Sequence, residues 1–177
     1  MYAVVVYESM FGNTRDIAES IAEGLADGGI GVRCIEVSEA PRIFDHPDLL
    51  VVGGPTHAFS MSRAGTRDSA RNETDAPLVS SIGIRDWLAD VEIARGQPFC
   101  TFDTKVPKPR LPGSAAASAA KRLKRAQGSM VASPETYWVA DMTGPLQGGE
   151  IERARSWGNG LASRIVEAAA TDQRKRA

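Results

Sequence analysis

Short segments rich in β-branched residues alternate with segments of helical periodicity, and this alternation limits the possible folds more than any other feature. The first segment, Tyr2-Ala-Val-Val-Val-Tyr7, has the composition of a strand buried on both faces of a sheet. Strands separated by helices form parallel sheets, because a parallel pair needs a long crossover connection. We therefore predict an α/β fold, a doubly wound five-stranded parallel sheet with helices on both faces. The predicted strands are residues 2–7, 32–37, 48–53, 98–102 and 129–140, the last of them broken near Pro134.

Local signals mark the ends of several predicted helices. Apolar residues recur at helical spacing from Ile17 to Leu25, and Gly28-Gly29 ends that helix. Ser114 is placed to cap an alanine-rich helix that reaches Gln127. The remaining predicted helices lie near residues 84–91 and 151–165, with a short helix expected within the polar residues 58–80, which are too many for a plain connection.

The size and charge of the chain exclude several functional classes. With 177 residues, 42% of them hydrophobic, it is predicted to form one domain over residues 1–167, followed by a frayed tail at residues 168–177. A net charge of −1 argues against a globally basic nucleic-acid binder. No apolar run is long enough for a membrane span, and Met1 leads into the first strand without a secretory signal, so we expect a cytoplasmic protein. Cys34 and Cys100 belong to no Cys/His cluster, so we expect two buried, reduced thiols and no metal site.

The loop after the first strand is the strongest candidate for a ligand site. Ligands of doubly wound sheets bind beyond the carboxyl ends of the strands, and here hydroxyl side chains and a glycine come just before a helix. The amides and the positive end of a helix N-terminus favour a phosphate, although a simple capped turn is the alternative interpretation. The loop has neither a Walker A pattern nor a dinucleotide-binding glycine pattern. The candidate phosphate-binding residues are Ser9, Met10, Phe11, Gly12, Asn13 and Thr14.

This loop, Ser9-Met-Phe-Gly-Asn-Thr14, resembles the loop that holds the FMN phosphate in flavodoxins, except that Phe11 stands where that family usually has a hydroxyl. The resemblance continues in Gly53-Gly-Pro-Thr-His-Ala-Phe59 and in the segment from Thr143 to Gly158. The Ser-Met-aromatic-Gly pattern is also similar to flavodoxin-like NAD(P)H:quinone oxidoreductases. The resemblance implies a flavodoxin-like sheet with strand order 2-1-3-4-5, FMN as the cofactor and a role in electron transfer.

The same resemblance implies that two further loops frame the flavin ring. The ring-binding candidates are Pro55, Thr56, His57, Ala58 and Phe59 after the third strand, and Thr101, Phe102, Asp103, Thr104 and Lys105 after the fourth. We expect Phe102 to pack inside the strand end rather than to stack on the ring. His57 is a candidate proton donor because histidine titrates near neutral pH, and a packed or solvent-facing side chain is the alternative. The catalytic residues remain unassigned.

Three functions are consistent with the sequence and the resemblance. The first is an FMN-binding flavoprotein that carries electrons to or from a redox partner protein. The second is a quinone reductase or oxidase that uses NAD(P)H or a quinol, with residues 58–80 as a lid. The third is a flavodoxin-like interaction module that has lost its flavin.

A cluster of basic residues concerns the binding of partner molecules. Lys121, Arg122, Lys124 and Arg125 fall in the last turns of the alanine-rich helix, where positive charge suits the helix dipole. They form either a solvated face or a docking patch for an acidic redox partner. Nucleic-acid binding is not expected, because no aromatic residues are interleaved with these charges.

Overall fold

A central parallel sheet organises the molecule, for which a computed structural model describes residues 1–57, 60–73, 80–107 and 113–176. The strand order is β2-β1-β3-β5, and the short strands β6 and β7 both pair with β5 in parallel. This is the predicted order 2-1-3-4-5, with the fifth strand split around Pro134 as expected. The strands are β1 (Tyr2–Tyr7), β2 (Gly31–Glu36), β3 (Leu49–His57), β4 (Ser60–Met61), β5 (Pro98–Lys105), β6 (Ser129–Met130) and β7 (Glu135–Trp138).

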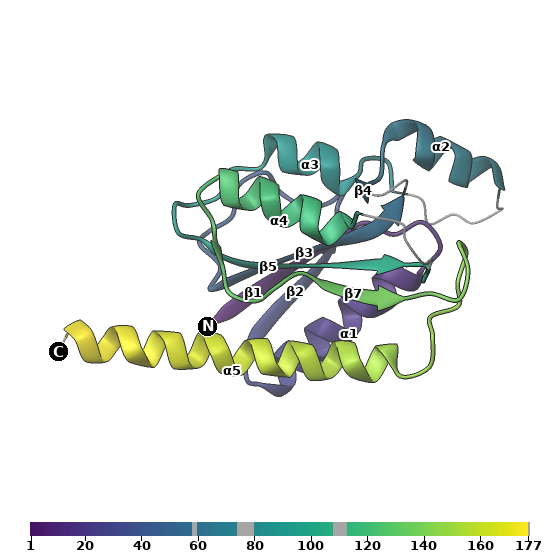
Figure 1. The fold of residues 1–177 in the computed structure, drawn as a ribbon. Helices are drawn as coiled ribbons and strands as arrows, with labels where there is room; N and C mark the ends of the chain where they lie inside the picture. Colours follow the sequence, from purple (N-terminus) through teal and green to yellow (C-terminus); the bar gives the residue numbers. More distant parts are fainter. Residues whose placement is uncertain (58–59, 74–79, 108–112, 177) are drawn as a thin grey trace.

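Helices cover both faces of the sheet, as predicted (Figure 1). Successive strand residues point to opposite faces, so Val5 and Val51 belong to the core beneath α1 and α5, while Val4 and Val52 belong to the core beneath α3 and α4. None of the helices in the described residues is long and apolar enough to cross a membrane. The helices are α1 (Asn13–Asp27), α2 (Ala64–Glu73), α3 (Ile84–Asp90), α4 (Ala115–Arg125) and α5 (Glu150–Arg176).

Glycines allow α1 and α5 to approach each other closely. A Cβ atom at Gly24 would collide with the carbonyl oxygen of Arg155, and one at Gly158 would collide with that of Ile21. The side chain of Arg155 also pairs with Asp27, at 2.7 Å between Nε and Oδ2. This contact fixes α1 against α5, and with it the loop that precedes α1.

The carboxyl ends of two central strands are longer than predicted. β3 continues past Gly53 to His57, because β4 pairs with it in an antiparallel hairpin, Thr56 opposite Met61. β5 continues to Lys105, which lies opposite Trp138 of β7. The short helix expected within residues 58–80 is α2. The lengthened ends of β3 and β5, α2 and the start of α1 lie at the same end of the sheet, on the right in Figure 1.

The extent of the last helix and the exposure of one cysteine differ from the sequence pattern. α5 continues to Arg176, past Ala168, where the frayed tail is predicted to begin. Three alanines from residue 168 to 170 favour the helix, and the Thr171 hydroxyl donates to the Glu167 carbonyl, so helical order persists without an inward stripe. Cys34 is exposed, because its strand β2 lies at the edge of the sheet, whereas Cys100 is buried as expected. The domain limit at residue 167 stays a prediction.

Candidate functional site

The first loop, residues 9–14, leaves the N-terminus of α1 open. Gly12 precedes the helix with φ of 89°, a left-handed conformation that favours glycine, and as a glycine it offers no side chain to cap the helix. The loop instead folds around Ser9, whose Oγ accepts hydrogen bonds from the amides of Gly12 at 3.1 Å and Arg15 at 3.4 Å. Ser9 and Thr14 are both buried, so their hydroxyls line the loop rather than solvent.

Several amides of this loop point to no protein acceptor. Within the described part of the chain, the backbone N–H groups of Met10, Phe11, Asn13 and Thr14 have no hydrogen-bond acceptor. Arg15 does not supply a cation here, because its guanidinium pairs with Asp16 at 2.9 Å. Such amides at the positive end of a helix suit an anion that binds through main-chain donors. A phosphate monoester fits this chemistry.

Neighbouring segments brace the first loop. Thr14 Oγ1 lies 2.7 Å from Thr104 Oγ1 at the end of β5. Asn13 Nδ2 donates to the Thr143 carbonyl at 3.1 Å. Gly144, with φ of 106°, packs so closely on the Asn13 side chain that a Cβ atom would collide with it. The sequence resemblance includes the segment from Thr143 but assigns it no role in the site, because the pattern does not reveal which residues it contacts.

The end of β3 presents the first set of ring-binding candidates. Pro55 lies opposite Thr104 at the end of β5, and Thr56 lies opposite Met61 of β4. The Thr56 hydroxyl donates to Asp103 Oδ2 at 2.7 Å. His57 is partly buried, and desolvation lowers its pKa below 6.5. Ala58 and Phe59, which are predicted to touch the ring, lie outside the described residues.

In the second set of ring-binding candidates, at the end of β5, the Asp103 side chain forms hydrogen bonds to several segments of the protein. Its buried carboxylate accepts hydrogen bonds from Ser114 Oγ at 2.6 Å and the Ala116 amide at 3.0 Å, besides Thr56. Its other oxygen accepts from Thr136 Oγ1 at 2.7 Å. This one side chain therefore joins the ends of β3 and β5 and the start of β7 to the capped start of α4.

Among the other members of this set, Thr101 and Phe102 lie in the core, whereas Lys105 is partly exposed at the end of the strand. Thr101 Oγ1 donates to the Ala116 carbonyl at 3.0 Å, and Phe102 packs in the core against Gly53 and Tyr137, as expected. Lys105 Nζ donates to the Gly113 carbonyl at 2.8 Å. A ring contact by Thr101, Phe102 or Asp103 thus rests on their backbone, whereas Thr104 lies beside the first loop.

A buried carboxylate that the sequence reasoning missed lies directly before the first loop. Glu8 is only 1% exposed, accepts a hydrogen bond from Ser62 Oγ and accepts another from the Ile84 amide at 2.9 Å. Arg67 of α2 donates to Ser62 Oγ at 3.0 Å and pairs with Asp86 at 2.7 Å. Burial raises the pKa of Glu8, against the hydrogen bonds and Arg67, which lower it. Through these contacts α2 and α3 are attached to the start of the loop.

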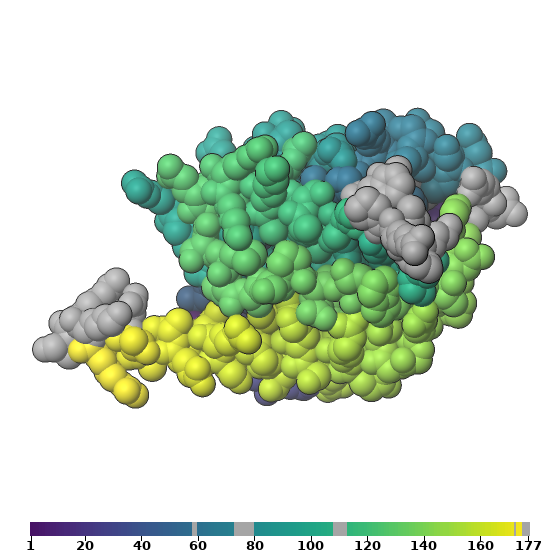
Figure 2. All heavy atoms as spheres, in the orientation of Figure 1, coloured from purple at the N-terminus to yellow at the C-terminus, as the bar shows by residue number. Residues whose placement is uncertain are grey.

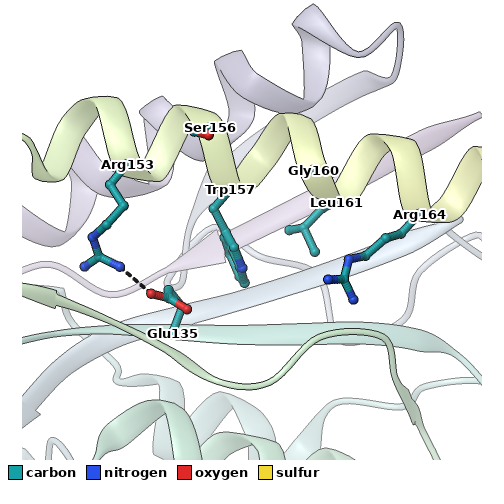
Figure 3. A pocket seen from close by; sticks show the side chains of 7 residues that line it. All are labelled: Glu135, Arg153, Ser156, Trp157, Gly160, Leu161 and Arg164. Carbon is teal, nitrogen blue, oxygen red and sulfur yellow. Dashed lines mark hydrogen bonds and ion pairs between the residues drawn. The ribbon is translucent and has the colours of Figure 1, made fainter.

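A separate pocket of about 340 Å³ lies between α5 and β7 (Figure 3). Arg153 forms ion pairs with Glu135 and Glu150 there and covers the Tyr137 ring at 4.3 Å. Because Arg153 is already paired with two carboxylates and no residue of the first loop lines the pocket, this pocket is not part of the candidate site. Its lining residues are Glu135, Arg153, Ser156, Trp157, Gly160, Leu161 and Arg164.

Known proteins share both sequence and fold features with this chain. A family model described as flavodoxin matches residues 5–76. A solved flavodoxin from the domain Archaea is 17% identical with a TM-score of 0.63, over 93% of this chain and 99% of that one. Oxidised flavodoxin 1 from Bacillus cereus is 15% identical with a TM-score of 0.66, over 94% and 98%. No curated protein sequence matches significantly.

A longer protein contains a similar fold. Rubredoxin oxygen:oxidoreductase from Desulfovibrio gigas is 17% identical with a TM-score of 0.61, and the similarity covers 96% of this chain but 37% of that one. At these identities the solved structures establish the fold, while the family match includes the first loop and β3. The chain is thus a flavodoxin-like protein, matching the flavodoxin family over residues 5–76 and sharing the flavodoxin fold over almost its whole length.

Proposed function

We propose that this chain binds FMN non-covalently and carries electrons between redox partners. The observation that carries the proposal is the N-terminus of α1, where amides that have no acceptor among the described residues lie beside the hydroxyls of Ser9 and Thr14. The match of residues 5–76 to a family of flavin proteins supports FMN as the anion.

In this proposal the first loop holds the FMN phosphate. The amides of Met10, Phe11, Asn13 and Thr14 donate to it, and the Ser9 hydroxyl, which accepts from the loop amides in the protein alone, can rotate to donate. No lysine or arginine is needed, because the helix dipole and the main-chain donors supply the favourable field. Gly12 keeps the approach to these donors free of a side chain.

The flavin ring is proposed to lie between Pro55–Phe59 and Thr101–Lys105. When bound, FMN supplies the reversible uptake of electrons, and the chain supplies position and local charge. His57 contributes little positive charge at neutral pH, because its partial burial favours the uncharged imidazole. Asp103 of β5 keeps the two strand ends at a fixed separation through its hydrogen bond to Thr56 of β3.

A matched pair of glycine variants tests the phosphate site. Gly12 and Gly29 flank α1, and both have positive φ, 89° and 81°. Gly12→Ala is expected to weaken FMN binding about tenfold, because an alanine disfavours the left-handed conformation by roughly 1–2 kcal/mol and the loop must rearrange. Gly29→Ala carries the same strain at the far end of the helix and is expected to leave the FMN dissociation constant unchanged. Equal loss of affinity in both variants would contradict a phosphate site at Gly12.

Turnover assays separate the proposed carrier from a reductase. A carrier alone oxidises NAD(P)H with a quinone no faster than background, and electrons flow only when a reductase is added. Rapid turnover by the purified FMN-loaded protein would establish a quinone reductase instead. Failure to retain any FMN would leave the interaction module.

A further inference from the structure

The outer face of α4 is entirely basic over its last turns. Four of its alanines and Leu123 are buried, and the helix carries four cations, Lys121, Arg122, Lys124 and Arg125, with no acidic residue. Lys121, Lys124 and Arg125 are exposed. The helix lies on the molecular surface in Figure 2, where it is drawn in green. The cluster therefore faces solvent rather than another element of the fold.

Two arginines from other elements extend this charge toward β4. Arg85 of α3 donates to the carbonyls of Ser62 at 3.0 Å and Met61 at 2.8 Å, and Arg122 of α4 donates to the Arg85 carbonyl at 2.9 Å. Arg63, which follows β4, is exposed. All of these hydrogen bonds go to uncharged acceptors, so the positive charge is not neutralised by them.

The charge of three of these arginines is not balanced by carboxylates. Across residues 1–57, 60–73, 80–107 and 113–176, no carboxylate lies within ion-pair distance of Arg63, Arg85 or Arg122. The pKa of Arg85 is lowered first by burial and then by its neighbours Arg122 and Arg63, while Asp86 and Glu8 oppose that effect. Like charges gathered without a counter-ion repel each other, and an external anion relieves that repulsion.

The charge is segregated within a nearly neutral chain. Residues 1–57 contain 3 basic and 9 acidic residues, whereas residues 60–130 contain 12 basic and 7 acidic residues. The net charge of −1 therefore hides an uneven distribution, with acidic side chains on α1 and cations on α4 and at Arg63 and Arg85 beside it.

The basic surface adjoins the proposed ring site. Ser60 accepts a hydrogen bond from Arg85 at 3.2 Å and donates to Ser118 of α4 at 2.9 Å. Ser60 also pairs with His57, and Met61 pairs with Thr56, in the β3–β4 hairpin. Arg85 thus contacts the strand that pairs with Thr56 and His57, two of the predicted ring-binding residues, so a partner seated on the cations approaches the proposed ring site.

We propose that this basic face, formed by Arg63, Arg85, Lys121, Arg122, Lys124 and Arg125, docks an acidic surface of a partner redox protein. Its relevance to electron transfer rests on the proposed function. The helix rises about 10 Å from Ser118, beside the hairpin, to Arg125, so the face suits an extended row of carboxylates better than a single phosphate. Complementary charge of this kind orients partners and speeds their encounter, and salt weakens it.

Binding of an acidic polymer tests the surface without any flavin. The probe is poly-L-glutamate, titrated against the full chain at low and physiological ionic strength. Arg63→Glu/Lys121→Glu is expected to weaken binding about tenfold, and added salt is expected to weaken wild-type binding in the same direction. The matched control is Arg33→Glu/Arg174→Glu, which makes the same charge change on β2 and α5 and is expected to bind as the wild type does.

Three results would overturn the docking surface. One is equal weakening in both double variants, which would reflect net charge alone. Another is the absence of salt-dependent binding to poly-L-glutamate. The third is tighter binding of duplex DNA than of poly-L-glutamate with the same dependence on Arg63 and Lys121, which would assign the face to nucleic acid.

Charged electron acceptors test whether the face serves the flavin. Oxidation of the reduced, FMN-loaded protein by ferricyanide, which accepts one electron, is expected to slow with rising salt and in Arg63→Glu/Lys121→Glu. A cationic cobalt(III) complex is expected to show the opposite salt dependence. If FMN binds but neither acceptor responds, the inference fails and the proposed function stands. If FMN does not bind, the poly-L-glutamate titration still decides whether an acidic partner docks here.

Discussion

Glu8 shows how one side chain links the candidate phosphate loop to the rest of the molecule. It is buried immediately before Ser9, and its two oxygens accept hydrogen bonds from Ser62 and from the Ile84 amide. Arg67 then connects Ser62 to Asp86. A carboxylate in such a position restrains the loop strongly, but its ionised form is disfavoured by desolvation.

The pH dependence of stability tests this description of Glu8. Because folding raises the pKa of Glu8, its contribution to stability is present at pH values below the ordinary glutamate value, about 4.3, and is lost as the pH rises through the folded-state pKa. Glu8→Gln removes this titration while retaining an acceptor for the Ile84 amide. Urea unfolding across the acid-to-neutral range is expected to show the variant gaining stability relative to wild type as pH rises. Parallel profiles for the two proteins would contradict a raised pKa.

His57 tests the electrostatics at the proposed ring site. Burial lowers its pKa below 6.5, so the stability that it contributes is present above 6.5 and is lost as the pH falls through the folded-state value. An NMR titration is expected to place its imidazole pKa below 6.5, with His46→Asn used to assign the two histidine signals. A pKa at or above 6.5 would restore His57 as a ready proton donor at neutral pH.

The roles of single residues are the features that are hardest to predict from the sequence. The hydroxyls and glycine of the first loop can be proposed because their types and spacing reveal a helix N-terminus after a strand. The sequence pattern assigns Asp103 to the ring, whereas its side chain joins three strands, and the same pattern gives Glu8 no role. Both roles depend on partners far away in the sequence, such as Thr136 and Ile84, and local patterns do not reveal such contacts.

At the scale of elements, the contact between α1 and α5 is set by the absence of side chains. Gly158 lies against the backbone of α1 at Ile21, whereas a Cβ atom at Gly160 of the same helix would meet no neighbouring atom within 4 Å. The two positions thus offer the same substitution in the same helix with opposite surroundings.

Gly158→Ala is expected to destabilise the protein by about 2 kcal/mol, because a methyl group forces the helices apart. Gly160→Ala is expected to stabilise it by up to about 1 kcal/mol, because alanine favours helix and meets nothing. Chemical denaturation of both variants measures the difference. Equal changes in the free energy of unfolding would show that the close approach of α1 and α5 is not required.

Elements are predicted well where their signals are local. The Ser114 cap is confirmed, since its Oγ accepts from the Ala117 amide at 3.0 Å, and the break at Pro134 separates β6 from β7. The extension of β3 to His57 is not predictable in this way, because it comes from pairing with β4 rather than from apolar alternation. The tail after Ala168 has helix-forming residues without an apolar stripe, and helix propensity decides its structure.

At the scale of the whole molecule, the sheet gathers three chemically different regions at the carboxyl ends of its strands: the first loop, the predicted ring site and the basic face. The strand order brings the first loop after β1 beside the ends of β3 and β5, although these segments lie far apart in the sequence. The hairpin of β3 and β4 then joins these strand ends to the basic face. The alternation of strands and helices is enough to predict the position of the strand ends, whereas the gathering of Arg63, Arg85 and the α4 cations on one face becomes visible only in the folded chain.

Titration of the purified protein with FMN and with riboflavin tests the central claim most directly, because the two ligands differ only in the phosphate. If the amides at the start of α1 hold that phosphate, FMN binds at least about a hundredfold more tightly, equivalent to roughly 2.7 kcal/mol. Equal affinity for the two ligands, or no affinity for either, would contradict a phosphate site in the first loop.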